Sequence, residues 1–126
     1  MNNTQRAGVA GLMAAVMLTA CSKSPESTVE AFHAAVAKGE VSEAKTYLHP
    51  NVTKMLGEQK VDAILAAQAE KLQKCGGIES MATEITGEGE IRNVTVTIDF
   101  KGDCPTKTEK VELRQLDGKW LIGSGK

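Results

Sequence analysis

Three cysteines, Cys21, Cys75 and Cys104, are the residues of this chain with the widest choice of chemistry. A thiol can bind a metal ion, exchange with other thiols, form a structural disulfide or be modified covalently. The chain has no Cys-x-x-Cys spacing, and no histidine lies at metal-ligand spacing from Cys75 or Cys104. Metal and redox chemistry are therefore the least favoured uses, and the surroundings of each cysteine must decide among the rest.

Cys21 follows a short polar start with one positive charge, Arg6, and an apolar run from Ala7 to Leu18. This order is typical of a secretory signal peptide. As a helix, the twelve-residue run would span roughly 18 Å, against a hydrocarbon core of about 30 Å. It is too short for a stable transmembrane helix, so we expect residues 1–20 to be a signal peptide.

The residues Leu18-Thr19-Ala20-Cys21 resemble the lipobox of bacterial lipoprotein signal peptides. The resemblance implies that the signal is cut before Cys21, that the thiol carries a diacylglycerol, and that the new amino terminus is usually acylated. Two or three acyl chains make a durable membrane anchor, whereas one chain holds only marginally. Ser22 after the cysteine implies, in a Gram-negative cell, the inner leaflet of the outer membrane facing the periplasm.

Export would place Cys75 and Cys104 in a compartment that permits disulfides. With Cys21 consumed by the lipid, these two cysteines form an even pair, 29 residues apart. Closing a loop of that size stabilises a domain by about 3.5 kcal/mol. We expect a structural disulfide, with two free thiols as the main alternative and a metal or redox role as the least favoured one.

The composition allows one small domain and argues against nucleic acid as a partner. The chain has 126 residues, 41% of them hydrophobic, with 15 Lys and Arg against 16 Asp and Glu. Binding to a phosphate backbone usually needs a basic excess or patch, and none is present. Only 3% of the residues are aromatic, namely Phe32, Tyr47, Phe100 and Trp120.

The elements that must position these residues begin with a helix after a short tether. Ser24 is expected as its N-cap, with Pro25 at the first helical position and Gly39 just past the end. Apolar residues recur on one face of it, at Val29, Phe32 and Val36.

Two further helices are expected, at about residues 42–48 and 61–74. His49-Pro50-Asn51 would stop the first of them, and Gly76-Gly77 the second. Residues 52–60 can add a short helical turn. The longer helix has an apolar face made of Val61, Ile64, Leu65 and Leu72.

After Gly77 the apolar period changes from that of a helix to that of a strand. Asp117-Gly118 is a strong signal for a two-residue hairpin between the last two strands. The pattern predicts an α+β domain in which three N-terminal helices pack on one face of a four-stranded antiparallel sheet. Four runs alternate, namely Met81 to Ile85, Val94 to Phe100, Val111 to Leu113 and Trp120 to Ile122.

This order of elements, with "VEAFHAAVAKGEVSEAKTYLHPNV" and "VELRQLDGKWLIG", resembles small exported domains of the nuclear-transport-factor-2-like, or cystatin-like, superfamily. It is most similar to the lipoproteins of unknown function in that group, over about Pro25 to Gly123. The resemblance implies a curved sheet that wraps a long helix as a cone and can leave an open pocket. The expected organisation is a signal peptide at 1–20, the lipidated cysteine and tether at 21–24, and the domain at 25–126.

Enzymes with this fold, such as ketosteroid isomerases and polyketide cyclases, place Asp, His or Tyr inside the cone for acid-base catalysis. In this chain His33 lies beside the apolar stripe of the first helix, and His49 is expected at a helix end facing exposed carbonyls. Asp99 follows the inward-facing Ile98, so it is expected on the solvent side. Tyr47 is most simply a core ring with its hydroxyl at the edge. We therefore assign no catalytic residue.

We expect a non-catalytic binding or protein-interaction module, anchored to a membrane through Cys21 and needing no cofactor or metal. A cone pocket formed by Phe32, His33, Tyr47 and Trp120 would bind a small apolar ligand, or the open sheet face would bind another envelope protein. An inhibitor or immunity protein is a related form. The alternative is a small enzyme of the cyclase or isomerase type. Two or more ionisable groups converging in the cone would favour the enzyme, and an apolar lining would favour binding.

Overall fold

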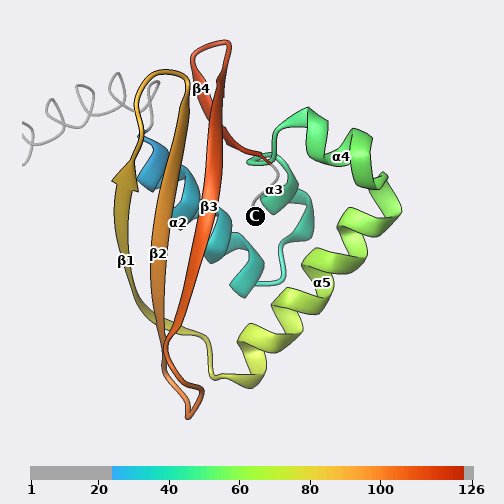
Figure 1. Cartoon of the computed structure of the whole chain (residues 1–126). Helices are drawn as coiled ribbons and strands as arrows, with labels where there is room; N and C mark the ends of the chain where they lie inside the picture. The colour runs from blue at the N-terminus through green and yellow to red at the C-terminus, as the bar shows by residue number, and fades with distance from the viewer. Residues whose placement is uncertain (1–23, 124–126) are drawn as a thin grey trace, which may run out of the picture.

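The computed structural model describes residues 24–123, which form four helices followed by four strands (Figure 1). The expected signal peptide and Cys21 lie outside the described residues. No helix among residues 24–123 is both long and apolar enough to cross a membrane. The helices are α2 (Pro25–Ala37), α3 (Val41–Lys45), α4 (Pro50–Leu56) and α5 (Glu58–Lys74). The strands are β1 (Ile78–Thr86), β2 (Ile91–Phe100), β3 (Lys107–Leu116) and β4 (Lys119–Ile122).

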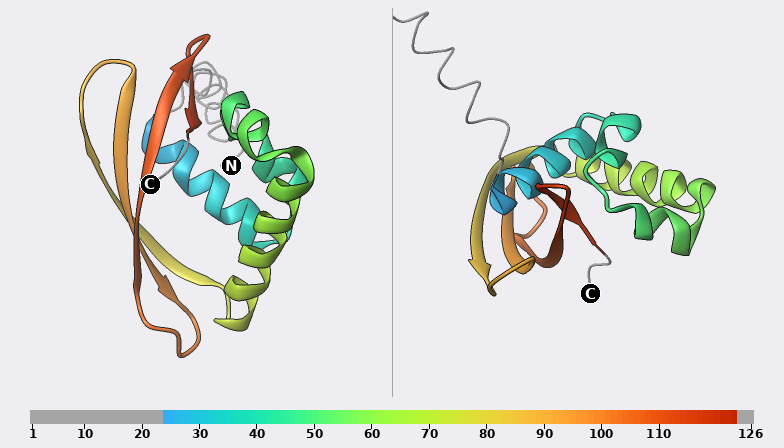
Figure 2. Two further views of the ribbon diagram at one scale, coloured as in Figure 1. Left: turned by 45° about the vertical axis from the view of Figure 1, so that its right-hand side comes forward. Right: turned by 90° about the horizontal axis from the view of Figure 1, so that it is seen from above.

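The strands form one antiparallel sheet in the order β1-β2-β3-β4, so each strand pairs with its neighbour in the chain. The sheet is curved, and α2 lies across its concave face, whereas α5 stands to one side, beyond β3 (Figure 2). This arrangement confirms the predicted α+β class, with helices packed on a curved four-stranded antiparallel sheet.

α2 begins and ends where its sequence predicts. Ser24 is the N-cap, whose hydroxyl accepts a backbone hydrogen bond at 3.1 Å, and Pro25 is the first helical residue. Gly39 follows the helix with a φ of 78°, a left-handed conformation that glycine adopts without strain. On its apolar face Val29 and Val36 are buried and Phe32 is partly buried.

The second helix is shorter than expected, because α3 ends at Lys45. The Tyr47 carbonyl accepts a hydrogen bond from the Ile122 N–H at 2.8 Å, and the His49 N–H donates to the Ile122 carbonyl at 2.7 Å. These bonds, with the bridge between Leu48 and Ile122, place residues 47–49 alongside β4. Pairing with the last strand therefore overrides the local helical pattern.

The short helical turn allowed for residues 52–60 is a separate helix, α4, which begins earlier, at Pro50, and brings the number of helices among residues 24–123 to four. Pro50 occupies its first position, and the His49 side chain caps it by accepting a backbone hydrogen bond at 3.1 Å. The expectation that His49 faces carbonyls at a helix C-terminus was therefore wrong. Gly57, with a φ of 92°, separates α4 from α5, which begins at Glu58 and not at Val61.

The turn between β3 and β4 is Asp117-Gly118, as predicted. Both residues have positive φ, 53° and 79°, which is the conformation that a two-residue hairpin of type I′ requires. β4 has only four residues and pairs with Leu113 to Leu116. The earlier half of β3 therefore extends beyond the end of β4.

α2 takes part in two clusters of buried apolar side chains. Burying a valine, leucine or isoleucine side chain contributes about 1.5–3 kcal/mol to stability. Because α2 contributes side chains to both clusters, it connects the sheet to the other helices. The cluster between α2 and the sheet includes Val29, Val94, Val96, Ile98, Leu113 and Ile122. The cluster that joins α2 to α3 and α5 includes Val36, Ala44, Val61, Leu65, Ala69 and Leu72.

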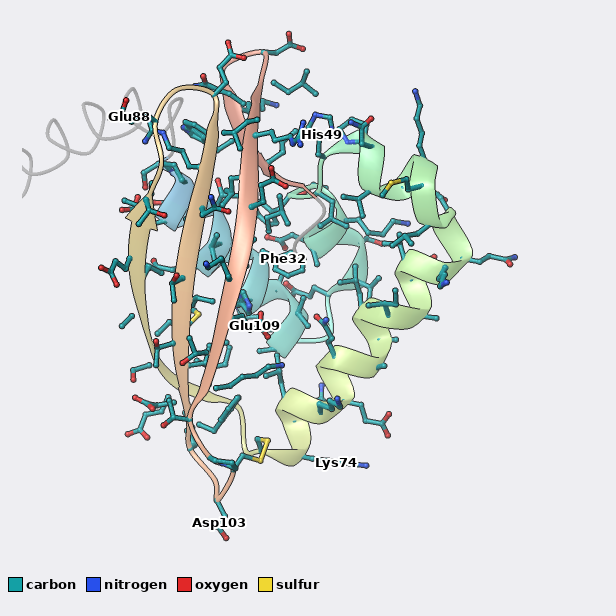
Figure 3. All side chains as sticks on the ribbon, viewed as in Figure 1. Phe32, His49, Lys74, Glu88, Asp103 and Glu109 are labelled. Atoms are coloured by element: carbon teal, nitrogen blue, oxygen red, sulfur yellow. A yellow bond between two sulfur atoms is a disulfide. The ribbon has the colours of Figure 1, made fainter. Side chains whose placement is uncertain are left out.

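A disulfide joins Cys75, at the end of α5, to Cys104 in the loop between β2 and β3, which confirms the predicted pairing. Figure 3 shows it between the labelled residues Lys74 and Asp103. The backbones also meet here, because the Gly102 N–H donates to the Cys75 carbonyl at 2.8 Å. A Cβ at Gly102 would lie 2.7 Å from that oxygen, so the contact requires glycine.

Candidate functional site: the cleft between α5 and β3

An open cleft lies between α5 and β3, with α2 at its floor. Its volume is about 340 Å³, within the range of small-molecule sites. Figure 3 shows Phe32 and Glu109 in the space between β3 and the helices. Most of the lining is apolar and includes Phe32 on α2, Leu56 on α4, Val61, Ile64 and Leu65 on α5, and Val111 on β3.

Large apolar side chains remain exposed at the rim of this cleft. Leu56 is 39% exposed and Ile64 38% exposed, and both line the cleft. The neighbouring Met55 is 68% exposed. Ile64 was expected on the apolar face of its helix together with Val61, Leu65 and Leu72, but unlike those buried residues it lies at the wall of the cleft.

The polar part of the cleft is a short chain of charged groups. His33 on α2 is 6% exposed, and its Nε2 lies 3.3 Å from Oε1 of Glu109 on β3. The second carboxylate oxygen of Glu109 lies 2.8 Å from Nζ of Lys107. Two or more ionisable groups therefore converge in the cone, so its lining is not purely apolar.

Each of these groups is engaged by another. His33 Nδ1 lies 2.9 Å from the Val29 carbonyl, and since a carbonyl only accepts, Nδ1 carries the proton. Nε2 can then donate to Glu109 when the ring is protonated. The hydrogen bond from His33, reinforced by Lys107 against the opposing effect of burial, lowers the pKa of Glu109 to about 2. Glu109 is therefore a carboxylate at neutral pH.

Of the four predicted pocket residues, the structure brings Phe32 and His33 together at the cleft and places Tyr47 and Trp120 elsewhere. Tyr47 is the first residue of the segment that pairs with β4, and its hydroxyl donates to Glu43 at 3.3 Å. Burial, followed by Glu43, raises the pKa of Tyr47. Trp120 packs against the sheet core with Arg92 5.1 Å from its ring centre. The predicted four-residue pocket was therefore wrong for Tyr47 and Trp120.

Asp99 lies on the outer face of the sheet, as predicted. It is exposed and accepts hydrogen bonds from Thr106 at 2.6 Å and Ser80 at 3.3 Å. Within residues 24–123, no three His, Cys, Asp or Glu side chains are grouped so that they could hold a metal ion.

Sequence reasoning missed Glu109, although a signal for it was present. Glu109 precedes Val111 and Leu113 by two and four positions on β3, so the strand period places all three on one face. Because Glu109 is charged, a search for alternating apolar residues begins at Val111 and leaves Glu109 out.

A second cleft, of about 490 Å³, lies beside the disulfide. Leu72 and Phe100 form its apolar part, and Lys71, Lys74 and Lys107 contribute cationic side chains to its lining. Because both clefts contain apolar surface, a binding experiment on this protein must distinguish them.

A curved antiparallel sheet that wraps one helix, with further helices beyond its last strands, defines an NTF2-like fold. A crystal structure from Campylobacter jejuni, described as a "Putative NTF2-like transpeptidase", superimposes on this chain with a TM-score of 0.72. The match covers 81% of this chain and 99% of that chain at 21% sequence identity, and at this identity it shows the fold alone. No curated protein matches the chain. The model of the family "Domain of unknown function (DUF4878)" matches residues 19–123, and the chain belongs to this family.

Proposed function

We propose that the protein is a lipid-anchored module of the cell envelope that binds an apolar ligand, or an apolar part of another envelope protein, without catalysis. The observation that carries this proposal is the cleft between α5 and β3, with its mostly apolar lining and exposed apolar rim. Binding sites combine such a lining with a few fixed polar groups. An inhibitor or immunity protein is the form of this function in which the bound part belongs to a toxin or hydrolase.

The alternative, a small acid-base enzyme of the cyclase or isomerase type, is favoured by one observation, the convergence of His33 and Glu109 in the cleft. A general base works best when its pKa is close to the working pH. The pKa of Glu109 is about 2, and both of its oxygens are engaged. These properties suit a structural ion pair better than a proton-transfer site, and so favour binding over catalysis.

The binding proposal is tested with an apolar fluorescent probe, 1-N-phenylnaphthylamine, and the variant Ile64→Glu. A charge at this cleft wall must be desolvated when the probe binds, so we expect the affinity to fall at least about tenfold. Leu116→Glu is the matched control, because Leu116 is 37% exposed and Ile64 38%, and Leu116 is not among the residues that line either cleft.

An equal loss in both variants, or no loss in Ile64→Glu, would show that the probe does not use this cleft. Phe100→Glu reports separately on the cleft beside the disulfide, which Phe100 lines. If only that variant loses the probe, the apolar site is the second cleft and the proposal for the first is wrong.

A further inference from the structure

β3 presents a free backbone edge to the cleft. Its residues Leu113 to Leu116 pair with β4, but Lys107 to Val111 extend beyond the last residue of that strand. Lys110 and Val111 from this part of β3 line the cleft. The unpaired edge and the apolar cleft therefore form one continuous surface.

Two hydrogen bonds show which backbone groups face this edge. The Gln115 N–H donates to Glu90 on the β2 side, and the Glu112 carbonyl accepts from the Gly123 N–H on the β4 side. In an antiparallel sheet the N–H and C=O of one residue point to the same side, and neighbouring residues alternate. The peptide groups of Lys110 and Thr108 therefore point to the β4 side, where no backbone group of residues 24–123 pairs with them.

The walls of the cleft limit what can pair with this edge. A paired strand lies about 4.8 Å from its neighbour, which places it over the floor formed by Phe32 and His33 and in front of α5. α5 stands opposite β3 and contributes Ile64 and Leu65 to the facing wall. α5 therefore bounds the space beside this edge, which favours a single extended segment over the edge of a second complete sheet.

We propose that an extended segment of another protein binds here by adding a strand to β3. The proposal rests on the proposed binding function and specifies its partner. The segment exchanges hydrogen bonds with Lys110 and Thr108, and its alternate side chains are apolar and enter the cleft. The remaining side chains face solvent beside Thr108 and Lys110, and a lysine such as Lys110 protects an exposed edge from unselective pairing.

The test uses an octapeptide selected from a random displayed library on the immobilised full chain, then synthesised with an N-methyl group at each position in turn. N-methylation removes one backbone donor and leaves the side chain. We expect affinity losses of about five- to tenfold at alternating positions, and little change at the positions between them. No selectable peptide, or a loss without alternation, would overturn strand addition.

The same edge is tested in the protein with Lys110→Pro and its control Lys110→Ala. Both variants lack the lysine side chain, but only the proline variant lacks the N–H that faces the edge. We expect Lys110→Pro to bind the octapeptide about tenfold more weakly than Lys110→Ala, with thermal unfolding of both used to verify the fold. Equal binding by the two variants would contradict the proposal.

The apolar probe separates this inference from the proposed function. If 1-N-phenylnaphthylamine binds in an Ile64-dependent way but no peptide binds, strand addition fails and the apolar site stands. If neither binds, both fail. If the peptide binds a variant that ends at Gly123 but not the full chain, the chain's own last residues are the occupant of the edge. If dimerisation competes with the peptide, the occupant is a second copy of the chain. Either result would overturn the proposal.

Discussion

His33 and Glu109 supply polar groups to the cleft and also stabilise the domain. They come from α2 and β3, 76 positions apart in the chain, and lie 3.3 Å from each other. A partly buried pair of this kind orients the elements that carry it, because removing one partner leaves the other without its hydrogen bond. The pair therefore holds α2, at the floor of the cleft, against β3, which forms one of its walls.

The lowered pKa of Glu109 predicts how this contribution depends on pH. The pKa falls from 4.5 to about 2 on folding, chiefly through His33, so the carboxylate adds stability that is fully present above about pH 4.5 and is lost as the pH falls through 2. We expect Glu109→Gln to unfold with a free energy on the order of 1–2 kcal/mol below that of wild type at pH 6, a figure reduced for partial exposure of the side chain.

Urea unfolding of both proteins at pH 6 and pH 2 measures this difference, which should nearly vanish at the lower pH. Glu84→Gln, on the exposed part of β1, is the control and should change little at either pH. A difference between wild type and Glu109→Gln that is the same at both values would show that the carboxylate charge does not stabilise the fold.

For single residues, the sequence predicts on which face of a helix or strand a side chain lies more reliably than it predicts which residues that side chain contacts. Helical spacing placed Phe32 and the neighbouring His33 next to the core, and strand alternation placed Asp99 outside. The misplacement of Tyr47 has a physical cause, because residues 47–49 pair with Ile122 at the other end of the chain. No local pattern contains that contact.

Among the elements, α5 is held in two different ways. Its buried residues pack on α2 and α3, and its end is tied covalently to the loop between β2 and β3 through Cys75 and Cys104. α5 forms one wall of the cleft, and the disulfide holds the end of that wall. The position of the wall therefore depends on a bond outside the cleft.

Replacing both cysteines by alanine is expected to reduce the free energy of unfolding by about 3 kcal/mol, because the unfolded chain regains the entropy that the closed loop had removed. Chemical denaturation of the oxidised wild type and of the Cys75→Ala/Cys104→Ala variant measures this. The reduced wild type is the control and should behave like the variant. A decrease in the free energy of unfolding of less than about 0.5 kcal/mol, well under the usual range for a native disulfide, would mean that packing alone holds α5.

The strands and the Asp117-Gly118 turn were predictable because a two-residue period and a hairpin dipeptide are local signals. The start of α4 was not, since His49-Pro50 was interpreted only as the end of one helix and the short helical turn was expected later, within residues 52–60. The same two residues begin the next helix, with the proline in its first position and the histidine as the cap. A proline that follows a capping side chain is compatible with the end of one helix and with the start of the next. The pairing of residues 47–49 with β4 decides which of the two forms.

For the whole molecule, the cleft exists because a helix packed on α2 stands away from a sheet that curves. The apolar period predicts the helices, and the resemblance implies the curved sheet and the cone, but the space between α5 and β3 depends on how several side chains pack together. The predicted location is a separate matter, because it rests on Cys21 and the residues before it. These lie outside the described part of the chain, and the anchor remains a prediction.

Cys21→Ser tests that anchor in the full chain produced in a bacterial envelope. We expect the wild type to fractionate with membranes and to carry the mass of added acyl chains, because several chains together hold a protein durably. The variant should lack both properties. Membrane association and lipid mass that persist in Cys21→Ser would refute the lipobox interpretation. Cys75→Ala/Cys104→Ala is the control for loss of the other two cysteines and should keep both properties.

The hydrogen bond from the Thr28 hydroxyl to the Trp120 carbonyl, at 3.2 Å, joins residues 92 positions apart. A chain is made from its amino terminus, so α2 is synthesised long before the strand that it must contact. The hairpins of the sheet can form early from neighbouring segments, whereas closure of α2 on β4 must wait for nearly the last residue. A chain that ends before Trp120 therefore lacks the strand on which α2 closes, and the sheet that covers this central helix is incomplete.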